Sequence, residues 1–183
     1  MPQTAVIVVD MLNDFVTGSL ACKRAERIIP PLVRLISAAR EAGVPVVYTN
    51  DSHLKGIDHE LALWGEHAMR GSAGAEVIPE LAPCELDYVI LKRRYSGFFQ
   101  TDLNILLKEL GVTDLVLAGL HTHMCVRHTA ADAYMWGYRL IVPTDGTDAF
   151  TEDDYGSGLA YLKSVYAASL TDCDSVIAGF ASA

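Results

Sequence analysis

The 183-residue chain has few cysteines and no long apolar run, and both absences exclude kinds of protein. The four cysteines, Cys22, Cys84, Cys125 and Cys173, are widely spaced and form neither a CxxC metal motif nor a dense disulfide pattern. No stretch reaches the ~18 apolar residues of a membrane-spanning helix, and no basic segment precedes the first apolar run as in a signal peptide. We expect a cytoplasmic protein that neither spans nor binds a membrane.

Positive charge is also scarce, because 14 Lys and Arg face 23 Asp and Glu and give a formal net charge of −9. Nucleic-acid binding depends on clustered basic side chains that replace counterions along the phosphate backbone, so no nucleic-acid partner is expected. Hydrophobic residues make up 51% of the chain, enough for a buried core without disulfides. We expect one domain over residues 1–183.

Short apolar runs rich in β-branched residues recur along the chain and predict buried strands. They cover residues 5–9, 44–48, 88–91, 115–120 and 140–143. Helical patterns lie between them and end at Gly43, Gly111 and Gly137, a residue type common just after a helix. This alternation predicts a three-layer α/β fold with a mostly parallel, doubly wound sheet.

Two regions are less regular. A sixth strand is predicted near residues 166–170 or 176–177, where the pattern is weaker. Residues 50–79 contain no clear element, and a compact domain rarely has so long a plain connection. Such loops usually carry function, so we expect this one to contribute to a binding or catalytic site.

Reactive side chains follow the predicted strands, at the edge where open parallel sheets bind their ligands. Asp10 follows the first strand, Lys92 the third, and Cys125 lies where a helix is expected to begin at residue 124 or 125. A helix N-terminus and a nearby cation both favour the thiolate, and free N–H groups in that turn are suited to bind an oxyanion. We predict a cysteine nucleophile for acyl transfer, with Asp10 moving its proton. The alternatives are a buried structural cysteine and a plain ion pair.

A second group suggests a metal site. Asp51 and His53 are two positions apart, which places both side chains on one side of an extended chain, and His67 follows fourteen residues later. Nitrogen and oxygen ligands with open coordination positions suit Zn²⁺ or another divalent ion. The alternative is a pair of ordinary loop histidines.

Four further residues have weaker assignments. Phe15 and Trp64 are candidates for an aromatic wall against a flat substrate, and core packing is the alternative for each. His59 and His128 belong to no group and are expected to be ordinary surface or capping residues.

Several segments together resemble the isochorismatase-like cysteine hydrolase superfamily. They are VVDMLNDF, TNDSH, WGEH, KRRYSGFFQTDL and LVLAGLHTHMCVRHTAADAYMWGY, spread over residues 4–150. The superfamily includes nicotinamidases, N-carbamoylsarcosine amidases, ureidoacrylate-type amidohydrolases and isochorismatases. The resemblance implies the isochorismatase-like hydrolase fold, with Asp10, Lys92 and Cys125 as the catalytic triad.

The resemblance also implies the surroundings of the nucleophile. A cis peptide bond is expected between Leu120 and His121, and the backbone N–H groups of His121 and Cys125 are expected to form an oxyanion hole. His121 and His123 stand where nicotinamidases more often have small or acidic residues. The resemblance therefore does not select one substrate.

The metal-containing branch of this superfamily has an Asp-x-His pair and a later histidine three residues past a tryptophan. Asp51, His53 and His67, with Trp64, match that spacing. The resemblance thus implies a divalent metal, zinc or alternatively iron or manganese, and no organic cofactor.

The activity implied is that of an amidase that releases ammonia from a small amide or ureido substrate through a thioester. A homodimer or homotetramer is expected. Two rival hypotheses remain: hydrolysis of a vinyl ether, as in isochorismatases proper, which needs no thiol, and a non-catalytic α/β interaction module.

Overall fold

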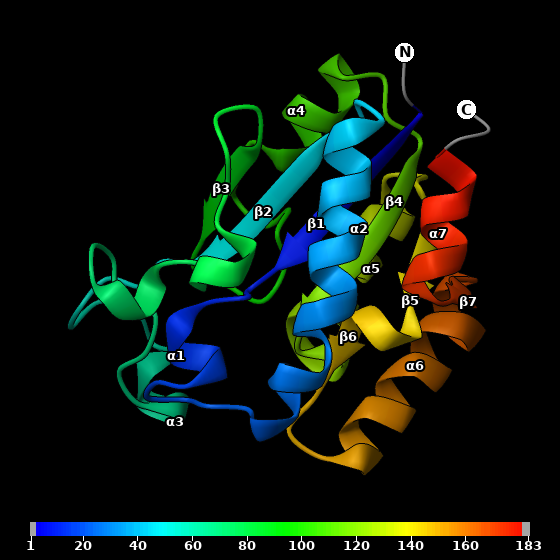
Figure 1. Cartoon of the computed structure of the whole chain (residues 1–183). Helices are drawn as coiled ribbons and strands as arrows, with labels where there is room; N and C mark the ends of the chain where they lie inside the picture. Colours follow the sequence, from blue (N-terminus) through cyan, green and yellow to red (C-terminus); the bar gives the residue numbers. More distant parts are fainter. Residues whose placement is uncertain (1–2, 181–183) are drawn as a thin grey trace.

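The computed structural model describes residues 3–180, which form a three-layer α/β fold with a seven-stranded sheet between two layers of helices (Figure 1). The strands are β1 (Thr4–Val9), β2 (Val46–Asp51), β3 (Tyr88–Lys92), β4 (Asp114–Leu120), β5 (Arg139–Pro143), β6 (Thr147–Asp148) and β7 (Ser169–Thr171). Their order is β3-β2-β1-β4-β5-β7, with β6 paired to β4. All these pairings are parallel, so the predicted fold class is confirmed.

Helices cover both faces of this sheet. They are α1 (Asn13–Val16), α2 (Ile29–Glu41), α3 (Leu61–Trp64), α4 (Leu103–Glu109), α5 (Arg127–Met135), α6 (Glu152–Tyr166) and α7 (Cys173–Phe180). In Figure 1, α2 and α7 lie on the face towards the viewer, and α4 and α5 lie behind the sheet. Within residues 3–180, no helix has both the length and the apolar character needed to cross a bilayer.

The central strand β1 shows why the layers stay together. Val6 and Val8 pack into the core beneath α2 and α7, whereas Ala5, Ile7 and Val9 pack into the core beneath α4, α5 and α6. All five side chains are fully buried, and burial of a valine or isoleucine contributes about 1.5–3 kcal/mol. This alternation on an all-apolar strand fixes β1 between two helical layers.

The helix α2 shows how local sequence sets its ends. Pro30 and Pro31 lie in its first turn, where the missing N–H of proline breaks no helical hydrogen bond. At the other end, Gly43 has φ +68°, a conformation that favours glycine and stops the helix.

The C-terminal part of the structure corrects one of the two positions predicted for a sixth strand. The strand β7 lies at Ser169–Thr171, so the first of the two predicted positions overlaps it. The second position, residues 176–177, is wrong because it falls within α7. Val176 is buried there in the core shared with α2, and an amphipathic helix rather than a strand satisfies that packing.

The connections from β1 and β4 diverge. The chain leaves β1 to form α2 on one face of the sheet, and it leaves β4 to form α5 on the other face. A crevice outside the carboxyl ends of strands forms at such a switch in direction, and it is the usual ligand site of an open α/β sheet. The fold therefore places a candidate site at the ends of β1 and β4.

Gly119 in β4 permits the close approach of β4 and β1. Its φ is +103°, and a Cβ atom built there would lie 2.1 Å from the carbonyl oxygen of Val9.

We expect Gly119→Ala to lower the free energy of unfolding by at least about 2 kcal/mol, measured by denaturant titration. The control is Gly156→Ala in α6, where an added Cβ meets no atom within 4 Å. Equal stability of the two variants would contradict this packing argument.

Candidate active site

Four reactive side chains lie side by side at the carboxyl ends of four neighbouring strands. Lys92 is the last residue of β3, Asp51 the last of β2, and Asp10 directly follows β1. Cys125 lies in a π-helical turn, Thr122–Val126, that directly follows β4 and His121. Their spatial order follows the strand order β3-β2-β1-β4, so the parallel sheet itself gathers residues that are far apart in sequence.

The ammonium group of Lys92 holds two carboxylates. Its Nζ lies 2.7 Å from Asp10 Oδ2 and 2.6 Å from Asp51 Oδ1, and all three side chains are buried. The backbone N–H of Asp51 donates to Asp10 Oδ1 at 2.7 Å. A carboxylate oxygen of Asp10, one of Asp51 and the sulfur of Cys125 all lie within 4.8 Å of one another. The structure thus brings together the three residues predicted as a triad, together with Asp51.

Burial and charge set the protonation of this cluster. Burial, together with the carboxylate of Asp51, raises the pKa of Asp10 to about 7, although the Lys92 ammonium opposes the shift. Burial alone would lower the pKa of Lys92, but Asp10 and Asp51 outweigh it and raise that pKa, so Lys92 is charged. A carboxyl group that titrates near neutral pH can both accept and return a proton during a reaction.

The protonation of Cys125 differs from the expected thiolate. Burial raises the pKa of Cys125 well above its usual value; the charge of Lys92 opposes the shift, and the carboxylates of Asp10 and Asp51 add to it. The helical turn begins at Thr122, so Cys125 is its fourth residue and not its first. The expected helix start at residue 124 or 125 is therefore wrong, and the raised pKa favours the neutral thiol over the expected thiolate.

The expected cis peptide bond between Leu120 and His121 is present. It joins β4 to the turn that carries Cys125. The use of the His121 and Cys125 amides as an oxyanion hole stays a prediction.

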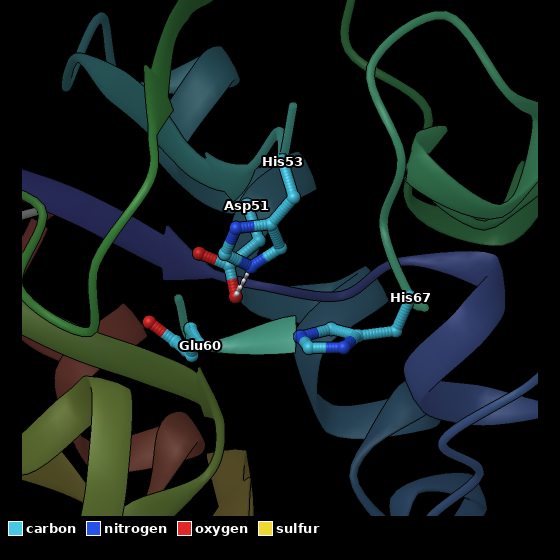
Figure 2. Close-up of side chains that lie close together, drawn as sticks. All are labelled: Asp51, His53, Glu60 and His67. Carbon is cyan, nitrogen blue, oxygen red and sulfur yellow. Dashed lines mark ion pairs between the residues drawn. The ribbon is translucent and has the colours of Figure 1, made fainter. Parts of the chain in front are cut away.

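A group of possible metal ligands lies next to the triad. Asp51, His53, Glu60 and His67 each offer one ligand atom, and these atoms lie within 4.8 Å of one another. Figure 2 shows the two imidazole rings and the two carboxylates gathered around a common space. Glu60 was not predicted, because it lies in an unpatterned loop and no spacing rule marks it as a ligand.

The donor atoms of the two histidines fit a cation. His53 Nε2 is buried and makes no hydrogen bond in the described part of the chain, although it lies 3.7 Å from Asp51 Oδ2, and its Nδ1 lies 3.2 Å from Asp58 Oδ2. His67 donates from Nδ1 to the carbonyl oxygen of Gly65 at 2.9 Å, which leaves Nε2 free. Burial lowers the pKa of His67, so it is neutral and able to ligate. Residues that orient metal-bound histidines in this way are a common feature of metal sites.

Backbone hydrogen bonds fold the long loop back onto itself. The N–H of His53 donates to Ala68 O, and the carbonyl of His53 accepts from Arg70 N–H, both at 2.9 Å. These bonds bring the His53 and His67 rings within 4.8 Å, centroid to centroid. The segment 50–79 therefore has a structural reason for its length, because it supplies the whole group of possible ligands.

A narrow pocket leads to the sulfur. Phe15 and Trp64, both proposed from sequence as an aromatic wall, line it together with Cys125, and Tyr95 completes one side. The indole N–H of Trp64 donates to the Tyr95 hydroxyl at 3.0 Å. The pocket is tight, since Cys125 is only 4% exposed.

A larger hollow of about 530 Å³ lies beside this pocket and shares Glu60 and Tyr95 with it. His59 and His128 line the hollow and lie outside the ligand group. His59 Nδ1 lies 3.1 Å from Arg94 Nη2, and His128 Nδ1 donates to Met124 O at 2.8 Å. Their expected capping and surface roles agree with these contacts.

The chain is similar over nearly its whole length to a family of known proteins. A family model described as "Isochorismatase domain" matches residues 4–174. The N-carbamoylsarcosine amidase of Thermoplasma acidophilum is 42% identical, with 94% of this chain and 98% of that chain covered and a TM-score of 0.88. The nicotinamidase PncA of Bacillus subtilis is 32% identical, with 93% and 100% covered and a TM-score of 0.89. A pyrazinamidase of Pyrococcus horikoshii, solved in complex with zinc, is 30% identical, with 93% and 99% covered and a TM-score of 0.87.

Replacement of Lys92 tests the charge balance of the cluster. We expect Lys92→Met to lower the free energy of unfolding by about 3–5 kcal/mol, because two buried carboxylates lose their counterion. The control is Lys55→Met, since Lys55 also pairs with a carboxylate, that of Glu66, but is 77% exposed. Denaturant titration of both variants measures the difference, and similar small losses would show that Lys92 does not neutralise the buried cluster.

Proposed function

Because the chain belongs to the isochorismatase family, we propose that it is a cysteine-dependent amidohydrolase that releases ammonia from a small amide or ureido substrate. The observation that carries the proposal is the buried cluster of Asp10, Lys92 and Cys125 at the end of a narrow pocket. The activities named for the Thermoplasma and Bacillus relatives support it, since one hydrolyses a ureido compound and the other a carboxamide.

Bond formation begins at the thiol. Asp10 takes the proton of Cys125, and the sulfur attacks the carbonyl carbon of the substrate. The backbone N–H groups of His121 and Cys125 stabilise the negative oxygen of the tetrahedral intermediate. When the C–N bond breaks, Asp10 returns the proton to the departing ammonia, and an acyl group remains on sulfur as a thioester.

A water molecule completes the cycle. Asp10 removes its proton, the oxygen attacks the thioester, and the sulfur leaves and recovers a proton. The product is an acid, or a carbamate that loses carbon dioxide when the substrate is a ureido compound. Throughout, Lys92 acts by its charge and position, because its pKa is raised and it stays protonated between the two carboxylates.

Asp51, His53, Glu60 and His67 would hold a divalent cation. Zinc suits two imidazole nitrogens and two carboxylate oxygens, although iron and manganese accept the same donors. The zinc complex of the Pyrococcus relative supports this assignment. When bound, the ion would supply a Lewis acid beside the pocket that orients a polar atom of the substrate or a water molecule. The nucleophile is activated separately, by Asp10.

We further propose that residues 1–183 act as a single domain in the cytoplasm, as a homodimer or homotetramer. The four cysteines are free, which fits a reducing compartment. Tyr134, Met135 and Trp136 at the end of α5 are large, apolar and exposed, which favours association between copies.

Removal of the nucleophile is the principal test. We expect Cys125→Ala to reduce kcat/KM by about a thousandfold or more, because no other group replaces the attacking sulfur. The measurement is ammonia release from nicotinamide, pyrazinamide, N-carbamoylsarcosine and ureidoacrylate. The exposed thiol of Cys84 provides the control, and Cys84→Ala should retain full activity.

Substantial amide hydrolysis by Cys125→Ala would remove the nucleophile assignment. Hydrolysis of isochorismate that persists in that variant would favour the vinyl-ether reaction, which needs no thiol. A wild-type protein inactive on every substrate would favour the interaction module.

The metal assignment is tested through Asp58, which orients His53 and is itself held by Arg93. We expect Asp58→Asn to weaken zinc binding about 10–100-fold, because the carboxylate that fixes the His53 imidazole is lost. Competition against a chromophoric chelator measures the affinity. Asp153→Asn, an exposed position in α6, serves as control, and equal zinc affinity in the two variants would count against the site.

A further inference from the structure

The side chain of His121 is buried in the catalytic pocket without a polar partner. The residue is 3% exposed, and both ring nitrogens are buried with no hydrogen-bond partner among residues 3–180. Burial of an unpaired polar side chain is costly and rare in native structures. The triad mechanism uses only the backbone N–H of this residue, so the imidazole still needs an explanation.

Neighbouring rings hold the imidazole in place. It stacks on Phe150 with a centroid distance of 4.0 Å and an interplanar angle of 27°, and it meets Phe15 edge-on at 5.8 Å. Both rings line the same pocket as Cys125. Burial, with the nearby charge of His123, lowers the pKa of His121 to about 3, so the ring is neutral and has one N–H and one lone pair. Such a ring is a preorganised partner for a ligand.

The position of His121 limits which part of a substrate it can meet. His121 directly precedes the turn that carries Cys125 and lines the same pocket, and its own backbone N–H belongs to the proposed oxyanion hole. In the proposed mechanism Asp10 protonates the departing ammonia, so the amide nitrogen of the substrate faces Asp10. This arrangement leaves the atom on the other side of the carbonyl to face the rest of the pocket wall, which includes His121.

We propose that His121 determines specificity, because its lone-pair nitrogen accepts a hydrogen bond from the N–H that a monosubstituted ureido compound carries beside the carbonyl. A carboxamide has a carbon atom at this position and cannot donate. The inference rests on the proposed amidohydrolase function and names the substrate class: ureido compounds of the form R–NH–CO–NH₂, selected over carboxamides R–CH₂–CO–NH₂.

A matched pair of substrates isolates this contact. N-carbamoylglycine and succinamate have the same length and the same carboxylate, and they differ only in NH against CH₂ beside the carbonyl. N-carbamoylsarcosine carries N–CH₃ there and has no hydrogen to donate. The readout is the ratio of kcat/KM for N-carbamoylglycine to that for succinamate, in which differences in enzyme folding or concentration cancel.

Two variants complete the design. His121→Phe keeps the aromatic stacking on Phe150 but removes both ring nitrogens, and we expect it to lower the ratio by about tenfold or more. His121→Gln keeps a donor and an acceptor, and we expect a smaller decrease. The corresponding ratio for N-carbamoylsarcosine should change little in either variant, because that substrate cannot make the bond.

The outcomes separate the two proposals. Hydrolysis by His121→Phe with an unchanged ratio overturns the role of His121 and leaves the amidohydrolase function intact. An equal change for N-carbamoylglycine and N-carbamoylsarcosine also overturns it, because the N–H would then not be the group recognised. Absence of ammonia release from all three substrates and from nicotinamide by the wild-type protein removes the proposed function and this inference together.

Discussion

The site depends on one buried ammonium group. Lys92 Nζ lies between Asp10 and Asp51 at 2.7 and 2.6 Å, out of contact with water. Two carboxylates so close together cannot both remain ionised in a dry environment without a cation. Lys92 supplies that cation, and it leaves Asp10 with a pKa of about 7 while Asp51 remains ionised because its pKa is lowered. The carboxyl group of Asp10 and the charge of the neighbouring group of possible ligands therefore share one counterion.

Polar groups without partners concentrate at this edge of the sheet. Within residues 3–180, the buried atoms that lack a hydrogen bond include His53 Nε2 and both ring nitrogens of His121. Away from this edge, the buried carboxylate of Asp148 is held by Arg24 and Arg27, although Arg24 Nη2 also lacks a hydrogen-bond partner. Natural proteins tend to break local rules where function requires it. The incomplete hydrogen bonding beside Cys125 is thus what a binding pocket requires, since ligands provide the missing partners.

Some features were within reach of the sequence and others were not. The apolar pattern does not indicate the helix α6, although Thr151 caps it by accepting from Asp154 N–H and acidic residues fill its first turn. The cap and the acidic first turn are local signals, so they were present in the sequence. Glu60 offered no signal at all, because its place among the possible ligands depends on a loop in which His53 N–H donates to Ala68 O and Arg70 N–H donates to His53 O. The protonated state of Cys125 was equally hidden, since it follows from burial.

The sequence by itself determined the parallel α/β fold and which reactive side chains follow its strands. Apolar runs, glycine stops and polar residues after strands are local patterns, and each is legible in a short window of the chain. Only the tertiary structure decided the distances and the protonation. Whether Asp10 is a base near neutral pH, and whether His121 lacks a partner, depends on which groups the fold brings within a few ångströms and on how completely it excludes water. Those properties belong to the packed sheet edge and not to any segment of it.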